Sequence, residues 1–478
     1  MTGFDPLASD SPLIVYIDYK SPYAFVAAEP TFELEDELGI EADWRPLTLD
    51  IPSYLGSARL DERGNVVEQN RTGDQWAAVK YAYRDARRYA ALRGLTLRGT
   101  VKIWDTSIAH IGMMWAKRQG RPILRAYTRG IYPPFWRREL DAEDPEVIAS
   151  VLARAGADVA GFESFLAGEG RAEHDAMQAA IFDAGIFGVP SYVVGGELFF
   201  GREHLPMVRW LLSGRSGPPP DIAYGHSQAA GGVLVTAGAP SPSLPGRSRS
   251  ELASPSRASQ GSGGTDLASP APLVVAIDFK QPQSYLAHAP TRDLAASLGI
   301  AIDWRPFAVP ALEPPAAEPA DDSRGESPGA RPAARTERHL RFRARYVEHD
   351  LHRYAAAQGL VLRDLDSSPD SSLAGVGLFF LREAVTMKAV DRGAVDAYVE
   401  RVFTGYWSGE LDIEDVGAIR RVLAEVGAAA AAFDPDALRD DYDRCLTGLR
   451  ESGVIAAPAY LVGDELFLGR AHLPMIRR

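Results

Sequence analysis

Hydrophobic positions near the start of the chain predict a strand that leads directly into a helix. Residues 13–17 are all apolar or aromatic and are followed by a turn at residues 18–20, a pattern typical of a short buried strand. Ser21 and Pro22 then predict the beginning of a helix over residues 24–38, because serine is a preferred N-cap and proline at the first helical position has no amide hydrogen. Such a junction directs free N–H groups and the positive end of the helix dipole at the space above Ser21, where a thiolate or small oxyanion would be stabilised.

The rest of the pattern completes one domain. Apolar residues at spacings of three to four, as at Tyr81, Tyr89 and Leu92, indicate helices in the long middle region. In order, the pattern predicts a strand at 40–45, helices from about 75 to 184, a strand at 191–194, a turn at Gly195-Gly196, a strand at 197–200 and a helix at 203–212. Strand–helix–strand, then a hairpin and a helix, is the thioredoxin layout, here with helices inserted between its halves. In that layout a proline precedes the third strand, in a tight turn where a cis X–Pro bond is favoured. Pro190 occupies this position.

The same motifs occur twice, in the same order. The clearest pairs are 17–20 with 277–280, 38–46 with 298–306, 89–95 with 354–360, 185–192 with 453–460, and 201–207 with 469–475. The matching order holds over about two hundred residues, far beyond the period of a solenoid repeat. The sequence therefore predicts a tandem duplication of a whole domain, with Pro458 as the counterpart of Pro190.

These patterns divide the chain into two copies and two connecting regions. The first copy spans 12–213 and the second spans 272–478, while residues 1–11 are expected to be disordered. Residues 214–271 are rich in serine, proline, glycine and alanine, a composition that predicts a flexible linker. A similar stretch at 310–335 inside the second copy predicts a mobile loop.

Charge and cysteine content exclude several classes of function. The 64 acidic and 51 basic residues give a net charge of −13, which argues against a nucleic-acid surface. We find no membrane-spanning apolar run and no secretory signal, and a single cysteine, Cys445, cannot form an internal disulfide, so we expect a cytoplasmic protein. Thiol–disulfide exchange would need a cysteine at the position of Ser21 or Gln281, and neither has one. No metal site is predicted, since the repeated His204 and His472 have no partnering ligands in sequence.

Three motifs of the first copy together resemble a known family. They are the segment 18–25 with its Ser-Pro-Tyr, the Arg-, Tyr- and Asp-rich stretch 80–93, and Gly185-Ile-Phe-Gly-Val-Pro190 before a glycine-turn hairpin. The combination resembles the DsbA-like thioredoxin superfamily, and more narrowly the 2-hydroxychromene-2-carboxylate isomerases and kappa-class glutathione transferases. The resemblance implies an α/β fold of two tandem thioredoxin-like domains, each with a helical insertion between its βαβ and ββα halves. It also implies glutathione as cofactor and a dimeric assembly.

The resemblance implies roles for six residues. Ser21 would be the catalytic serine that hydrogen-bonds the glutathione sulfur, and the remaining five would bind glutathione: Val189 and Pro190 through the backbone, Glu203 in place of the family's aspartate, Lys80 as the nearest substitute for its lysine, and Tyr23 in the pocket. Structural roles compete with each of these. Ser21 could serve only as a cap, Glu203 as a favourable charge at a helix start, Tyr23 as packing and Lys80 as part of a solvated face.

The implied chemistry depends on a thiolate. A thiol with a pKa of about 8.5 is mostly protonated at neutral pH, and a helix N-terminus together with a hydroxyl donor lowers that pKa. In an isomerase the thiolate adds to a conjugated carbon and is later eliminated, whereas in a transferase it stays attached to the electrophile. Both reactions act on a small electrophilic substrate.

The second copy has lost the residues that would carry this chemistry. Gln281 replaces the serine and Ala471 replaces Glu203, while the fold-defining Trp304, Pro458 and Gly469 remain. We therefore interpret the second copy as a non-catalytic domain. It could supply, within one chain, the surface that a second subunit provides in a dimer, which would make the chain an intramolecular pseudo-dimer. The alternative assembly is a homodimer. The competing hypothesis is a binding or scaffold protein built from two redox-inactive thioredoxin-like domains, and glutathione binding separates the two.

Overall fold

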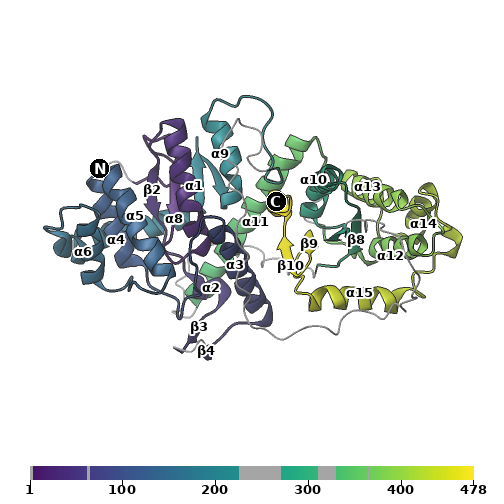
Figure 1. The fold of residues 1–478 in the computed structure, drawn as a ribbon, viewed down its shortest axis with the longest axis horizontal. Coiled ribbons are helices and arrows are strands. Elements are labelled where there is room, and N and C mark those ends of the chain that lie inside the picture. The colour runs from purple at the N-terminus through teal and green to yellow at the C-terminus, as the bar shows by residue number, and fades with distance from the viewer. Residues whose placement is uncertain (1–3, 62–64, 225–270, 310–329, 364, 366) are drawn as a thin grey trace, which may run out of the picture.

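Two four-stranded sheets organise the chain, one in each copy. The computed structural model describes residues 4–61, 65–224, 271–309, 330–363, 365 and 367–478. Figure 1 shows the copies side by side, with helices α4–α6 at one end of the molecule, α12–α15 at the other, and α3 and α11 near the middle. Among the described residues, no helix is long and apolar enough to cross a membrane.

The sheet of the first copy has the order β2-β1-β5-β6. Its central strand β1 is parallel to β2 and antiparallel to β5, and β6 completes the hairpin. Helix α1 connects the two parallel strands, and all four residues of β1 are buried. The bounds are β1 (Ile14–Ile17), α1 (Pro22–Leu38), β2 (Asp43–Pro46), β5 (Ser191–Val194) and β6 (Glu197–Phe200), followed by η1 (Arg202–His204) and α9 (Leu205–Leu212). The predicted strand–helix–strand and hairpin are confirmed.

The insertion between the halves of the first copy is mainly helical, as predicted. Its helices are α3 (Gly73–Ala91), α4 (Ser107–Arg118), α5 (Arg121–Trp136), α6 (Pro145–Arg154), α7 (Phe162–Ala167) and α8 (Glu169–Asp183). Before them lie a short helix and a hairpin that the sequence did not reveal: α2 (Ile51–Leu55), β3 (Ala58–Leu60) and β4 (Val66–Gln69). These three elements contain no buried residue, so no alternation of buried and exposed positions marks them in the sequence.

The second copy repeats this architecture with the sheet order β10-β9-β7-β8. Trp304 is fully buried like its counterpart Trp44, so both form part of a core as expected. The elements are β7 (Leu273–Ile277), α10 (Pro282–Leu298), β8 (Ile302–Pro306), α11 (Ala330–Gln358), α12 (Ser372–Thr386), α13 (Gly393–Ser408), α14 (Val416–Glu425), η2 (Ala430–Ala432), α15 (Arg439–Glu451), β9 (Ala459–Val462), β10 (Glu465–Leu468), η3 (Arg470–His472) and α16 (Leu473–Ile476). Residues 330–335, expected in a loop, belong to α11; 310–329 lie outside the described residues.

Two segments predicted to lack structure are held by specific contacts. Residues 4–11 were expected to be disordered, but the Arg45 guanidinium donates hydrogen bonds to the backbone oxygens of Asp5 and Ala8 at 2.7 Å each. Part of the predicted linker is likewise fixed, since Asp221 forms an ion pair with Arg470. Carbonyl and carboxylate groups that bind buried arginines order both segments, although their composition resembles that of unstructured chain.

The copies contact each other through two equivalent helix–strand contacts. Helix α3 of the first copy lies along β10 of the second, where the Tyr81 hydroxyl accepts a hydrogen bond from the Leu468 N–H at 2.6 Å. Helix α11 of the second copy lies in the same way along β6 of the first, where the Tyr346 hydroxyl accepts from the Phe200 N–H at 2.8 Å. Tyr81 and Tyr346 occupy equivalent positions of the repeat, so the two contacts are related as in a symmetric dimer.

Arginines on the same two helices add ion pairs and hydrogen bonds to both helix–strand contacts. On α3, Arg88 pairs with Glu465 and donates to the Leu466 carbonyl at 2.7 Å. At the equivalent position of α11, Arg353 pairs with Glu197 at 2.8 Å and donates to the Leu198 carbonyl at 3.3 Å. The same residue types are thus used twice, once in each direction across the interface.

Candidate functional site

The site is built at the junction of β1 and α1. Ser21 is the N-cap of α1, and its Oγ accepts a hydrogen bond from the Ala24 N–H at 3.2 Å. The Ser21 N–H donates to the Asp18 carbonyl at 3.0 Å, which closes the turn after the strand. Ser21 is only 4% exposed. The predicted cap is therefore confirmed, and its hydroxyl sits at the positive end of a 17-residue helix.

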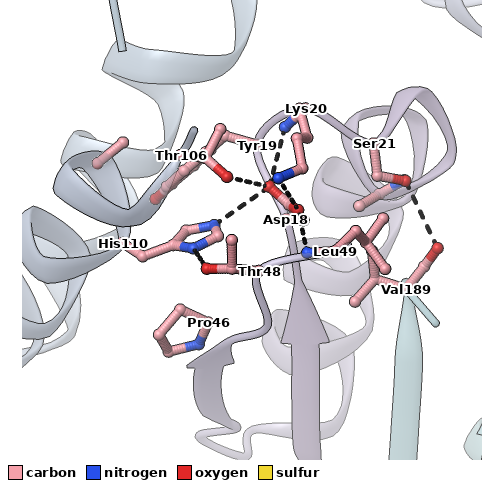
Figure 2. A network of polar contacts seen from close by, with 12 residues as sticks. Asp18, Tyr19, Lys20, Ser21, Pro46, Thr48, Leu49, Thr106, His110 and Val189 are labelled. Carbon is pink, nitrogen blue, oxygen red and sulfur yellow. Dashed lines mark hydrogen bonds and ion pairs between the residues drawn. The ribbon is translucent and has the colours of Figure 1, made fainter. Parts of the chain in front are cut away.

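A cis peptide bond lies beside this hydroxyl. The Val189–Pro190 bond is cis, and Ser21 Oγ donates to the Val189 carbonyl over a long 3.5 Å (Figure 2). The Pro190 carbonyl accepts from the Gly201 N–H at 2.9 Å, which ties this turn to the segment that contains Glu203. The structure thus brings together Ser21, Val189 and Pro190, as the sequence predicted.

A buried polar network beneath the junction was missed by sequence reasoning. Asp18 is completely buried, and its carboxylate accepts from the Thr106 hydroxyl at 2.6 Å and from the Leu49 N–H at 2.8 Å. The Lys20 ammonium lies 3.5 Å from Asp18, and His110 Nε2 lies 3.3 Å from it (Figure 2). Burial alone would raise the pKa of Asp18, but Lys20, His110 and Thr106 outweigh it and hold that pKa below its usual range. Asp18 is therefore a buried anion that fixes the turn before Ser21.

The network continues away from Ser21 through two histidines. Thr48 Oγ1 lies 2.7 Å from His110 Nδ1 and 3.0 Å from His174 Nε2. Burial, followed by the neighbouring His110, lowers the pKa of His174 to about 4, so His174 is neutral at physiological pH. The groups of this network come from the turn after β1, the start of α4, helix α8 and the loop after β2, so no short motif could have revealed them.

Tyr23 connects the site to the second copy. Its hydroxyl donates to Asp85 Oδ2 at 3.2 Å, and the other oxygen of Asp85 lies 2.9 Å from His472 Nε2 of the second copy. Burial, then the charge of Asp85, raises the pKa of Tyr23 well above its usual value. Burial would raise the pKa of Asp85 as well, but His472 and Arg88 lower it below its ordinary range. The repeat of His204 and His472 was the only sequence signal for this contact.

The last two predicted residues, Glu203 and Lys80, are both exposed. Glu203 is exposed in η1, and its charge contributes to the raised pKa of Tyr23, after burial, Asp85 and Tyr81. Lys80 is exposed on α3, with its Nζ 5.9 Å from the centre of the Trp76 ring. Within the described part of the chain, no hydrogen bond or ion pair joins Lys80 to Ser21 or Glu203. The hydrogen bond from the Gly201 N–H to the Pro190 carbonyl therefore places the segment of Glu203 beside the cis turn, whereas no contact among the described residues links Lys80 to that turn.

The equivalent junction in the second copy has different chemistry. Gln281 stands at the N-cap of α10, but its side chain accepts no capping hydrogen bond. The Asp278 carboxylate accepts a hydrogen bond from the Ser371 hydroxyl at 2.5 Å. Gly375 stands at the position equivalent to His110, and the Tyr442 side chain fills the space beside this glycine. Burial raises the pKa of Asp278, and its remaining partners do not offset this effect. The two copies share a fold, but only the first has a serine hydroxyl over a stabilised anion.

Three further features bear on what the protein could bind. A pocket of about 40 Å³ between the first copy and α11 includes Leu49, Phe187 and His339 but not Ser21. It has room for a few water molecules only. In the described ranges, no group of three or more histidine, cysteine or acidic side chains is arranged to hold a metal ion. Burial raises the pKa of the single thiol, Cys445, which keeps it protonated at neutral pH.

A family model of the DSBA-like thioredoxin domain matches the chain twice, at residues 12–213 and 273–478. A 2-hydroxychromene-2-carboxylate isomerase of Pseudomonas putida is 25% identical over 195 residues, which are 40% of this chain and 90% of that protein. Proteins of the same name from Pseudomonas sp. (strain C18) and Sphingobium xenophagum are 23% and 25% identical, over 42% and 41% of this chain and 89% and 95% of theirs.

Two solved structures are also similar to part of the chain. A structure of a 2-hydroxychromene-2-carboxylate isomerase is similar with 21% identity and a TM-score of 0.33, covering 42% of this chain and 94% of that one. The structure of a probable DsbA oxidoreductase from Streptomyces coelicolor matches with 20% identity and a TM-score of 0.33, covering 43% and 91%.

Proposed function

The chain belongs to the family of DSBA-like thioredoxin domains, which it contains twice, and on this basis we propose that its first copy is a glutathione-dependent isomerase or transferase. The relatives named isomerases support the first of these activities. The observation that carries the proposal is the contrast between the two junctions. Ser21 places a hydroxyl at the N-terminus of α1 beside a cis-proline turn, whereas the second copy has Gln281 there.

The residues of the first copy suit a bound thiol. The Ser21 hydroxyl makes only a long hydrogen bond of 3.5 Å to Val189, so it can turn to a stronger acceptor. The α1 dipole and that hydroxyl would both stabilise negative charge at a sulfur atom above Ser21. The Val189 backbone at the cis turn would pair with the cysteinyl unit. Glutathione would supply a thiolate that adds reversibly to a conjugated carbon, or that stays attached to an electrophile.

We also propose that the second copy takes the place of a partner subunit. The reciprocal contacts of α3 and α11 use equivalent tyrosines and arginines, as an isologous interface does. The second copy would then be retained for the surface it presents rather than for a reaction of its own.

The test is a titration of glutathione into the wild type and Ser21→Ala, followed by calorimetry and by thiolate absorbance at about 240 nm. In the wild type the pKa of the bound thiol should fall by about one unit or more below its usual 8.5. Ser21→Ala should lose this shift and about a hundredfold to a thousandfold of turnover, since it removes one hydrogen-bond donor to the developing charge.

Gln281→Ala is the matched control, because it changes the same position of the copy that lacks the serine. It should leave both readouts as in the wild type. Absence of binding at millimolar glutathione would instead favour the competing function, a redox-inactive scaffold. That function is supported by the second copy, where Gln281 and Ala471 replace the residues proposed to act in the first.

A further inference from the structure

The second copy contains a buried arginine that binds a carboxylate of its own chain. Arg470, in the segment equivalent to Gly201-Arg202-Glu203, is 2% exposed. Its Nε lies 3.1 Å from one oxygen of Asp221 and its Nη2 lies 3.4 Å from the other. The Gln358 amide donates to the same carboxylate at 2.9 Å, and Gln283 accepts from Arg470 Nη1 at 2.7 Å. This two-point contact is the geometry in which arginine recognises a carboxylate.

The first copy has the same arginine without the internal carboxylate. Arg202 corresponds to Arg470, and both guanidinium groups lie over equivalent tyrosine rings, Arg202 at 3.6 Å from the centre of Tyr89 and Arg470 at 4.9 Å from that of Tyr354. Arg202 is partly exposed, and it forms no ion pair with any residue that the structure describes. Asp221 lies in the segment between the copies, and its carboxylate contacts Arg470 and Gln358 of the second copy.

We propose that Arg202 binds a carboxylate of the ligand of the first copy, and that Asp221 fills the corresponding place in the second copy and closes it. The inference deepens the proposed function and rests on it for the position of the ligand. Arg202 lies next to Glu203 in η1, and the Gly201 N–H is bonded to the Pro190 carbonyl, so this segment adjoins the cis turn beside Ser21. A carboxylate on Arg202 would orient a molecule whose reacting atom lies above Ser21.

Two sources of carboxylate fit this position. Glutathione has two carboxylate groups, and a chromene carboxylate of the kind named in the isomerase relatives has one. A guanidinium group can bind the carboxylate of either molecule, because its two parallel N–H donors match the two carboxylate oxygens. The experiment below therefore uses one probe for each source.

Three probes are titrated by calorimetry into the full chain: glutathione, S-methylglutathione and salicylate. Arg202→Gln should weaken the binding of a carboxylate probe by about tenfold to a hundredfold, the effect of losing a charge-assisted pair of hydrogen bonds. Arg209→Gln removes an arginine of the following helix α9, one paired with Glu37, and this variant should bind as the wild type does. Loss confined to the two glutathione probes assigns the carboxylate to glutathione, and loss confined to salicylate assigns it to the substrate.

A second variant tests the closed copy. Asp221→Ala should free Arg470, and the stoichiometry of carboxylate binding should rise from one to about two per chain. Wild-type affinity for every probe in Arg202→Gln would overturn the inference, as would a folded Asp221→Ala that still binds one equivalent. These readouts are separate from those of the proposed function, because S-methylglutathione has no thiol to ionise. The binding of S-methylglutathione can depend on Arg202 even if Ser21 activates no thiolate. Conversely, Ser21 can activate the thiol of glutathione even if no probe depends on Arg202.

Discussion

Replacing Asp18 with alanine is expected to lower the free energy of unfolding by about 3–5 kcal/mol, because one member of a buried charge pair would be left alone. The remaining member is Lys20, whose side chain is 5% exposed and 3.5 Å from the Asp18 carboxylate. The Thr106 hydroxyl and the Leu49 N–H would also lose their acceptor. Denaturant unfolding of the full chain measures the loss, and the same change should disturb the turn that holds Ser21.

Asp278→Ala is the matched control for this prediction. Asp278 occupies the equivalent place in the second copy, but its partner Lys280 is partly exposed and no histidine lies beside it. Removing it should therefore cost only about 1–3 kcal/mol, the usual effect of lost hydrogen bonds. Equal losses in the two variants would contradict the idea that the first copy has a specially stabilised anion.

The same two carboxylates predict opposite responses to acid. The pKa of Asp18 is lowered in the folded state, so its stabilising effect is present at neutral pH and is lost as the pH falls below the ordinary value of 3.8. The pKa of Asp278 is raised by burial, so its protonated form is favoured in the folded state and its effect is unfavourable once the pH rises above that raised value. Below a pH of about 4, the protection of backbone amides against hydrogen exchange, relative to the intrinsic exchange rate at each pH, should fall more in the first copy than in the second, and Asp18→Asn should remove that difference.

The local features of the fold could be predicted because each has a local cause. The strand before Asp18 and the cap at Ser21 are each determined by a few adjacent residues. The strands of the hairpin 191–200 have the predicted bounds. The second strand begins three residues later than predicted, at Asp43. The reason is that Gly39 adopts a left-handed conformation at φ 64° and the Ile40 N–H bonds back to the Glu35 carbonyl, so this segment completes the helix end.

The contacts that build the site have no local cause and could not be predicted. Thr106 and His110 reach Asp18 across about ninety residues of sequence only after α4 has packed on the sheet. The contact between Asp85 and His472 spans 387 residues and depends on how the two copies dock. A repeat in the sequence shows that there are two copies, but it does not show which surfaces of the copies meet.

Asp85→Ala is expected to lower the free energy of unfolding by about 2–4 kcal/mol, because the buried Tyr23 hydroxyl and His472 would both lose their acceptor. Asp85 is 3% exposed and receives contacts from both copies, from Tyr23 at 3.2 Å and from His472 at 2.9 Å. We expect the variant to weaken glutathione binding as well, by about tenfold, since Tyr23 lies in the first turn of α1, two residues after Ser21. Calorimetry and thermal unfolding of the same samples measure both effects.

Asp85→Asn separates interface stability from positioning of the site, because it keeps an acceptor for the Tyr23 hydroxyl. It should restore most of the glutathione affinity that Asp85→Ala loses. His472→Ala removes the contact that the second copy makes with Asp85. If His472→Ala kept wild-type affinity, the second copy would act on the first only through overall stability. If it lost about as much affinity as Asp85→Ala, His472 would be a residue of the second copy that positions the first copy's site through Asp85, which would explain why a domain without a serine at its own helix N-cap has kept this surface.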